Sequence, residues 1–192
     1  MKKRCAWAEM SAPELSIPYH DNEWGVPVHD DIKHFEFMLL DCFQAGLSWS
    51  TILKKRHRFR TVFDGFDPSI IAAYDENKKG ELMQDAGIIR NRRKIDASVM
   101  NARSFIAVQD EFGSFDAYIW RFVSGSPLVN EFSCMEDIPA HTPLSDTVSK
   151  DLKQRGFSFV GTTICYAYMQ AAGLVNDHET GCFRYREIIG MY

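Results

Sequence analysis

The chain has 192 residues, 45% of them hydrophobic and including 14 Phe and 4 Trp, which suffices for the core of one domain. Its formal net charge is −4, and no stretch approaches the roughly 18 apolar residues of a membrane-spanning helix, so we expect no membrane contact. The odd count of five Cys disfavours a disulfide framework, and the basic N-terminus lacks the apolar run of a secretion signal, so we expect the reducing cytoplasm.

Hydrophobic periodicity predicts a mostly helical chain. Residues 31–44 carry apolar side chains at helical spacing, with Asp30 before them as a candidate N-cap. A second helix is expected over residues 48–63, and Pro68, at a first helical position, begins a third. Further helices are expected near residues 81–85, 90–109, 115–123, 144–155 and 159–172. Because no segment alternates clearly with a period of two, the predicted fold class is all-α.

Aromatic and acidic side chains gather in two of these segments. Residues 19–25, expected in a loop, contain Tyr19 and Trp24, and residues 41–49, where the first predicted helix is joined to the second, contain Asp41 and Trp49. If these side chains line one cavity, they suit a flat ring with a positive charge. A cation gains about 0.5–2 kcal/mol over an aromatic face, and a carboxylate pairs with the charge. The alternative is that both Trp residues belong to an ordinary core.

A short helix, a Gly-containing turn and a basic helix follow one another over residues 82–95. This order is typical of a helix-hairpin-helix, in which the turn and the N-terminus of the second helix offer N–H groups to a DNA phosphate. Gly87 permits a backbone conformation that other residues resist. Positive charge at the turn comes from Arg90, Arg92, Arg93 and Lys94. Such contacts position DNA without reading its sequence, and the alternative is a helix C-cap followed by a charged surface helix.

The positive charge of the chain is concentrated in its middle. Residues 51–108 carry 12 Lys and Arg against 7 Asp and Glu, whereas both flanking segments are acidic. Residues 54–60 form a second basic cluster, whose charges are distributed around much of a helix. A local basic face can bind phosphates even on an acidic protein, although an ordinary solvated face explains the same counts.

Two Cys and two His lie near the ends of the chain. Cys5 and His20 are near the start, and His178 and Cys182 are near the end. Two thiolates and two imidazoles make a closed tetrahedral ligand set for a structural zinc ion, which would tie the termini together. The spacing is not that of a zinc finger, and Cys and His are also common as plain buried residues, so both interpretations stay open.

Taken together, these segments resemble the bacterial 3-methyladenine DNA glycosylase I family. The motifs that carry the resemblance are CAW at 5–7, YHDNEWGVP at 19–27, QAGLSW at 44–49, QDAGIIR at 84–90, RGFSFVGTTICY at 155–166 and GLVNDH at 173–178. They cover nearly the whole chain in order. The resemblance implies a helix-hairpin-helix DNA glycosylase fold with a structural Zn²⁺ joining the N- and C-terminal segments. The implied ligands are Cys5, His20, His178 and Cys182.

The resemblance also implies roles for residues around the base. The implied base-binding residues are Tyr19, Trp24 and Trp49, the implied catalytic carboxylate is Asp41, and the implied plug residues, which fill the gap left by the extruded base, are Gln44 and Leu47. The family usually has Glu at Asp41, Gly at Cys42 and an aromatic residue at Ser16. Asp is one methylene shorter than Glu, which affects the strength and selectivity of base binding more than the reaction class.

We therefore expect an enzyme that hydrolyses the N-glycosidic bond of 3-methyladenine in alkylated double-stranded DNA and releases the free base. No Lys is placed as a Schiff-base nucleophile, so a monofunctional enzyme is expected. Asp116, the nearest downstream candidate for a catalytic base, is expected to cap a helix instead. One alternative is a non-catalytic zinc-stabilised module that recognises damaged duplex, and another is an all-α protein-interaction domain with no DNA role.

The expected organisation is one glycosylase unit over residues 1–192, acting as a monomer. Its central helical part covers about residues 31–110, with the helix-hairpin-helix near 80–100. Residues 1–30 and 111–192 are expected to form the zinc-clasped part.

Overall fold

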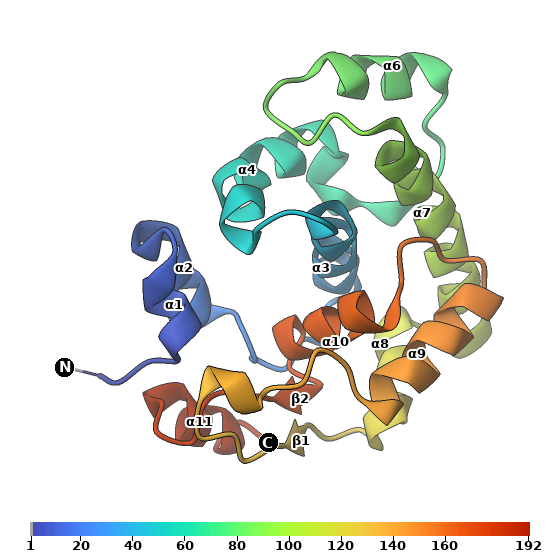
Figure 1. Ribbon diagram of the computed structural model, residues 1–192. Coiled ribbons are helices and arrows are strands. Elements are labelled where there is room, and N and C mark those ends of the chain that lie inside the picture. The colour runs from blue at the N-terminus through green and yellow to red at the C-terminus, as the bar shows by residue number, and fades with distance from the viewer. Residues whose placement is uncertain (1) are drawn as a thin grey trace.

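The computed structural model describes residues 2–192, most of which lie in helices (Figure 1). The α-helices are α1 (Ala6–Met10), α2 (Pro13–Asn22), α3 (Asp31–Gln44), α4 (Trp49–Val62), α5 (Pro68–Ile71), α6 (Glu76–Gln84), α7 (Arg92–Phe112), α8 (Phe115–Trp120), α9 (Pro143–Gln154), α10 (Thr162–Ala171) and α11 (Phe183–Ile189). The 3-10 helices are η1 (Asp64–Phe66), η2 (Arg121–Val123) and η3 (Met135–Asp137), and the strands β1 (Leu128–Val129) and β2 (Val175–Asn176) pair in parallel. The all-α prediction is confirmed. Among residues 2–192, no helix combines the length and apolar character needed to cross a membrane.

Capping side chains explain where the predicted helices begin. At the start of α3 the Asp30 carboxylate accepts a hydrogen bond from the Lys33 amide (2.8 Å), as expected. At the start of α6 the Asp75 carboxylate accepts one from the Lys78 amide (2.9 Å). α6 therefore begins earlier than predicted, because this cap starts a polar helix whose first turn shows no hydrophobic pattern.

The segment around Tyr19 differs from the prediction. Tyr19 and His20 lie on α2, not in a loop. Pro13 at the start of α2 fixes a helical backbone angle, but the helix has almost no apolar stripe that periodicity could detect. The expected cap at Asp116 is also wrong. The cap of α8 is the Ser114 hydroxyl, which accepts from the Ala117 amide at 2.9 Å.

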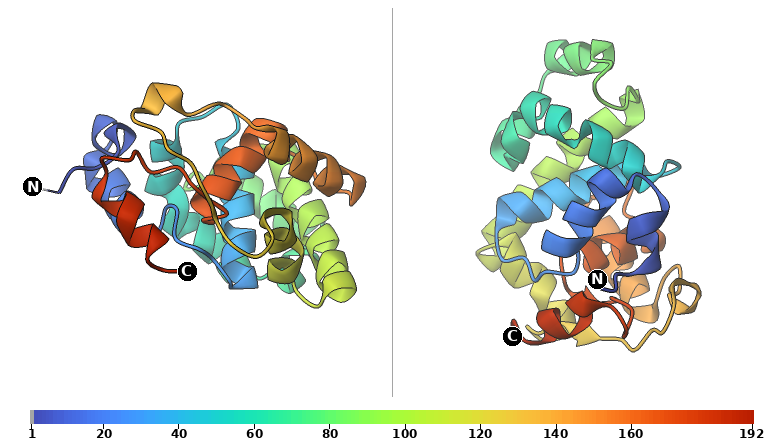
Figure 2. Two further views of the ribbon diagram at one scale, coloured as in Figure 1. Left: turned by 90° about the horizontal axis from the view of Figure 1, so that it is seen from below. Right: turned by 90° about the vertical axis from the view of Figure 1, so that its left-hand side faces the viewer.

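α3 is the central helix, and all its residues from 34 to 43 are buried. It packs against α4, α7, α8 and α10. In Figure 1, α4 and α6 lie above α3 and α10 lies below it, whereas α1 and α2 form a wall on the left. In the left view of Figure 2, α1 and α2 again lie at one end of the molecule, near α11. The residues of α3 therefore contact other helices on several sides, and one side of α3 faces the space next to α1 and α2.

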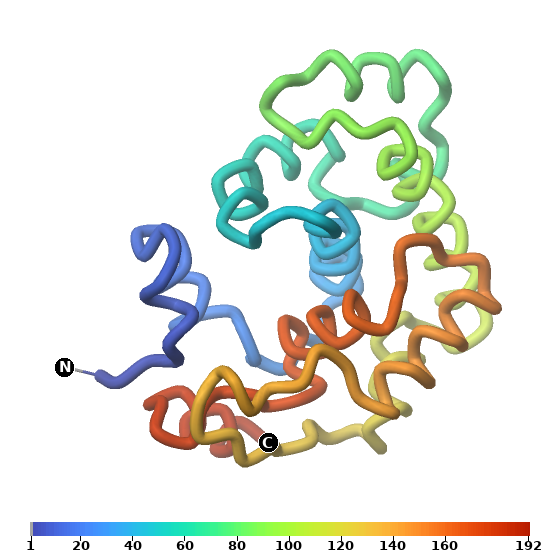
Figure 3. Tube along the Cα trace, viewed as in Figure 1, coloured from blue at the N-terminus to red at the C-terminus, as the bar shows by residue number. Residues whose placement is uncertain are grey.

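The N- and C-terminal segments lie side by side (Figures 2 and 3). The Phe183 amide donates to the Lys3 carbonyl at 2.9 Å, and the Ala6 amide donates to a Glu179 carboxylate oxygen at 2.7 Å. Hydrogen bonds between the two terminal segments therefore hold them together without a metal ion.

A network of charges joins α2 to α3 and α4. The Arg56 guanidinium contacts the carboxylates of Glu23 (2.7 Å) and Glu36 (3.0 Å). Although burial acts to raise it, hydrogen bonds from Arg56 and Lys33 lower the pKa of Glu23 to about 2. Arg56 is thus largely withdrawn from solvent by this network, whereas Lys54, His57, Arg58 and Arg60 of the same segment are exposed, as expected for a solvated helix.

Candidate functional site

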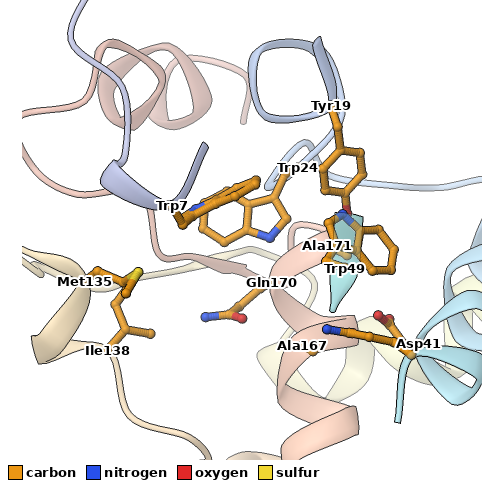
Figure 4. A pocket seen from close by; sticks show the side chains of 11 residues that line it. Trp7, Tyr19, Trp24, Asp41, Trp49, Met135, Ile138, Ala167, Gln170 and Ala171 are labelled. Carbon is orange, nitrogen blue, oxygen red and sulfur yellow. The ribbon is translucent and has the colours of Figure 1, made fainter. Parts of the chain in front are cut away.

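A cavity of about 300 Å³ lies between the wall formed by α1 and α2 and the helices α3 and α10 (Figure 4). It is lined by Trp7, Tyr19, Trp24, Asp41, Gln44, Trp49, Met135, Ile138, Ala167, Gln170 and Ala171. The structure therefore brings the predicted residues of the base site and one of the two predicted plug residues around one space, although they come from two separate segments of the chain.

Aromatic rings form the walls of this cavity. The ring centroids of Tyr19 and Trp49 are 5.2 Å apart, and those of Trp7 and Trp24 are 5.1 Å apart in an edge-to-face arrangement. Sequence reasoning missed Trp7, which lies on the five-residue helix α1. The available signal was its place in the CAW motif at 5–7, two residues after the candidate ligand Cys5.

Asp41 is the acidic group of the cavity. It lies near the end of α3 and is only 2% exposed, and its Oδ2 atom has no hydrogen-bond partner among the described residues. Burial raises the pKa of this carboxyl well above its usual range. The indole Nε1 atoms of Trp7 and Trp49 are also buried without a partner. Buried polar atoms normally have hydrogen-bond partners, so these three suit a ligand that carries both donors and acceptors.

A tight turn projects Leu47 beside the cavity. The Leu47 amide donates to the Gln44 carbonyl at 2.6 Å, and Gly46 has a φ of +80° at the position where a type II turn requires glycine. Leu47 is 41% exposed, which is unusual for a leucine next to a pocket. The turn therefore holds an apolar side chain out toward solvent at the cavity side of the molecule.

Lys94 supports this turn. The sequence predicted that Lys94 binds a DNA phosphate, but its amine is not free to do so. It is 6% exposed, and its Nζ donates to the carbonyls of Phe43 (2.8 Å) and Ala45 (2.7 Å). These carbonyls lie at the C-terminal end of α3, where a helix leaves its carbonyl groups unpaired. Lys94 is thus a positioning residue for the loop that carries Gln44 and Leu47.

The turn between α6 and α7 also corrects the expected role of Gly87. Its φ is not in the left-handed region, and its amide donates to the Asp85 carboxylate at 2.7 Å. A Cβ at this position would lie 2.5 Å from Cγ of Arg58. Glycine fits here because the Arg58 side chain of α4 packs against this position, and the Gly87 N–H already has a partner.

The arginines of this turn have different environments. Arg92 forms ion pairs with Glu76 and Asp96. Arg90 and Arg93 are exposed and form no ion pair with any residue in the described part of the chain. The side chains that remain available to an anion are therefore those of Arg90 and Arg93, next to the N-terminus of α7.

Cys5, His20, His178 and Cys182 form a fully buried cluster whose candidate ligand atoms all lie within 4.8 Å of one another. Cys5 Sγ is 3.4 Å from His178 Nδ1, and Cys182 Sγ is 3.5 Å from His20 Nε2. Sulfur and nitrogen ligands of a tetrahedral zinc ion, at about 2.3 and 2.0 Å from the metal, lie roughly 3.5 Å apart. The four side chains can hold a metal ion, and their geometry fits zinc.

The other nitrogen of each imidazole also has a partner. His20 Nδ1 lies 2.8 Å from the Asp21 carboxylate, which in turn pairs with Arg4. His178 Nε2 lies 3.1 Å from the Trp24 carbonyl. Each ring can therefore donate from one nitrogen and leave the other free to bind a metal, as is usual for metal-binding histidines.

This cluster and the cavity share walls. Trp24, which lines the cavity, packs edge-to-face on His178 with ring centroids 4.6 Å apart. The cluster of Cys5, His20, His178 and Cys182 thus packs directly behind Trp24.

Comparisons with known proteins agree with this arrangement. The family model described as methyladenine glycosylase matches residues 7–185. The chain is 50% identical to "DNA-3-methyladenine glycosylase 1" of Escherichia coli K12, over 95% of this chain and 97% of that protein. A crystal structure of 3-methyladenine DNA glycosylase I superposes with a TM-score of 0.90 at 51% identity, covering 94% of this chain and 98% of that one. Another such glycosylase, solved in complex with 3-methyladenine, has a TM-score of 0.89 at 31% identity, covering 94% of this chain and 96% of that one.

Proposed function

Because the chain belongs to the methyladenine glycosylase family and is therefore an N-glycosylase of base-excision repair, we propose that its aromatic cavity binds and releases 3-methyladenine from alkylated DNA. The observation that carries this proposal is the buried, unpaired carboxyl of Asp41 in the cavity that Tyr19 and Trp49 also line.

The cavity recognises the positive charge of the base and the hydrogen-bonding groups on the edge of its rings. Methylation at N3 makes adenine in DNA a cation, which gains electrostatic energy beside an aromatic face and a carboxylate. Asp41 accepts a hydrogen bond from the exocyclic amino group at C6. In the free protein burial raises the pKa of this carboxyl, and the positive charge of the bound base favours its ionised form. The Nε1 groups of Trp7 and Trp49 donate to ring nitrogens of the base.

The lesion reaches this cavity by leaving the DNA stack. Extrusion costs a few kcal/mol and is cheaper for a damaged, weakly paired base. Leu47, with Gln44 behind it, fills the gap in the duplex. The exposed side chains of Arg90 and Arg93 and the first amides of α7 bind backbone phosphates, which matches the role of the second helix in a helix-hairpin-helix.

The chemistry needs little acid assistance. The positively charged base is a good leaving group, and water attacks C1′ of the sugar as the glycosidic bond breaks. The residues lining the cavity include Asp, Gln, Tyr and Trp side chains but no Lys that could form a Schiff base. The enzyme is therefore monofunctional and leaves the DNA strand intact.

Zinc is the metal of the Cys5, His20, His178 and Cys182 cluster, and its role is structural. Four protein ligands close the coordination sphere, so no position remains for substrate or water. The ion joins residues 1–30 to the C-terminal segment and supports the wall of the cavity. The whole chain is one glycosylase unit that acts as a cytoplasmic monomer on double-stranded DNA.

The test is incubation of the protein with methylated duplex DNA, followed by chromatography of the released bases. Free 3-methyladenine is expected, with no strand cleavage. A module that only binds damaged duplex would retain the DNA without releasing any base. Metal analysis of the fresh protein is expected to give about one zinc per chain, as a single tetrahedral site requires.

A further inference from the structure

The cavity has a polar end and an apolar end. In Figure 4, Asp41, Trp49 and Tyr19 lie on one side, whereas Met135 and Ile138 lie on the opposite side. The carboxyl of Asp41 is at the first end, and the second end presents the thioether of Met135 and the aliphatic side chain of Ile138. Gln170 lies between the two ends, and its Nε2 already donates to the Asp177 carboxylate at 2.8 Å. We call the space beside Met135, Ile138 and Trp7 the apolar compartment.

The chemistry of adenine determines which part of a lesion enters this compartment. C6 and N3 are opposite atoms of the six-membered ring, so the amino group and an N3 substituent point in opposite directions. If Asp41 holds the amino group, as proposed above, the N3 substituent points away from α3 and toward Met135 and Ile138.

The walls of the compartment can adapt to groups larger than methyl. Met135 belongs to the short helix η3, and its unbranched thioether side chain changes shape easily. Both Met135 and Ile138 are half-buried, so this end of the cavity is not closed by a buried wall.

The backbone behind these side chains is nevertheless fixed. The Ser133 hydroxyl donates to Asp137 at 2.8 Å across η3, and the Thr180 amide, between the cluster residues His178 and Cys182, donates to the Phe132 carbonyl at 2.8 Å. The compartment therefore combines an adaptable surface with a fixed position relative to Asp41.

We propose that this protein accepts adenines whose N3 substituent is a longer apolar chain, such as butyl, and that Met135 and Ile138 determine this range. The inference depends on the orientation given under the proposed function. Each methylene buried at the apolar end adds up to about fourfold in affinity.

Binding of free 3-methyladenine and 3-butyladenine tests the proposal without requiring turnover. Quenching of tryptophan fluorescence reports the binding, because three Trp residues line the cavity. We expect the full chain to bind 3-butyladenine at least as tightly as 3-methyladenine. Met135→Trp, which fills the compartment, should weaken 3-butyladenine relative to 3-methyladenine by about tenfold or more, the effect of a steric change worth about 1.4 kcal/mol.

Ile138→Trp is a second variant at the same compartment, with the same expected result. Met100→Trp is the matched control, because Met100 is exposed on α7 away from the cavity lining, and the ratio of the two affinities should not change. The inference is overturned if the unaltered protein binds 3-butyladenine about tenfold more weakly than 3-methyladenine, or if Met135→Trp weakens both bases equally. Failure to bind either base would instead count against the proposed function itself.

Discussion

Tyr19 and His20 are adjacent on α2, yet their side chains belong to different sites: Tyr19 lines the aromatic cavity, and His20 belongs to the Cys and His cluster that can hold a metal ion. Successive residues of a helix point about 100° apart, so one turn of α2 can serve both sites. Any disturbance of His20 is therefore expected to reach Tyr19 through the helix that carries both.

Metal removal should affect both stability and base binding. Losing a buried structural ion is among the few changes that cost more than about 4 kcal/mol. For a chain of this size that cost lowers the melting temperature by roughly 8–16 °C. We expect chelation, or Cys182→Ser, to produce this decrease in calorimetry and to weaken 3-methyladenine binding. Cys134→Ser is the control, because Cys134 lies outside the cluster; an equal loss in that variant would contradict the assignment.

Asp41→Asn should lower activity and raise stability. The variant loses the carboxylate for the cationic base, and a charge-assisted hydrogen bond is worth about 1.5–3 kcal/mol, so the rate of 3-methyladenine release should fall roughly 10- to 100-fold. Because the folded-state pKa of Asp41 is raised, its contribution to stability is present below its unfolded pKa and is lost as pH rises. Asn does not ionise, so the variant does not lose this stability as pH rises.

The measurement is melting temperature against pH for both proteins, beside the rate of base release. The gain in stability of Asp41→Asn should be larger at neutral pH than at pH 4. A variant that is both inactive and less stable at neutral pH would instead indicate that Asp41 supports the fold.

Arg56→Met should reveal the buried charge network. Arg56 is the partner of Glu36, which is 1% exposed, and breaking a buried pair costs about 3–5 kcal/mol because one charge remains unpaired. Arg58→Met, on the same helix, removes a half-exposed pair with Asp85 and should cost less than about 1 kcal/mol. Chemical unfolding of the two variants provides the comparison.

The ion pairs of Arg56 also make the free energy of unfolding depend on pH in the acidic range. The pKa of Glu23 is lowered from 4.5 to about 2, so its contribution is fully present above pH 4.5 and is lost as pH falls toward 2. Unfolding free energy measured between pH 5 and pH 2 should therefore fall more steeply in the unaltered protein than in Arg56→Met. Equal slopes would show that Arg56 does not set the pKa of Glu23.

Leu47→Ala should impair extrusion of the base from duplex DNA without impairing binding of the free base. The exposed Leu47 side chain does not line the cavity, so free 3-methyladenine should bind the variant normally. Release of the base from duplex DNA should fall, since the vacated stack is no longer filled and extrusion costs a few kcal/mol. Activity on single-stranded DNA should change less. A variant that loses free-base binding would place Leu47 in the pocket.

Arg93 and Lys94 are adjacent but should have opposite effects on salt dependence. Arg93→Ala removes an exposed charge, so the slope of log affinity against log salt for duplex DNA should decrease by about one unit. Lys94→Met removes a buried amine that caps α3, so it should lower activity through the Gln44–Leu47 loop and leave the slope unchanged. A changed slope for Lys94→Met would restore it as a phosphate contact.

Local sequence signals were sufficient for much of the fold. The cap at Asp30 and the apolar spacing after it predict α3 closely, and Gly46 marks the turn after it, because these features depend on backbone conformation and on neighbours within a few residues. The four candidate metal ligands could also be named from residue type together with the family resemblance.

Contacts between distant segments decided the rest. Lys94 belongs to a run of basic residues, but the carbonyls of Phe43 and Ala45 draw it into the interior, and no local pattern encodes that partner. Gly87 is explained by the approach of Arg58 on another helix. The isolation of the Asp41 carboxyl, and with it the raised pKa, exists only where α3 meets the aromatic wall built on α1 and α2. Desolvation depends on every neighbour around a group, and the order of residues along the chain does not specify those neighbours.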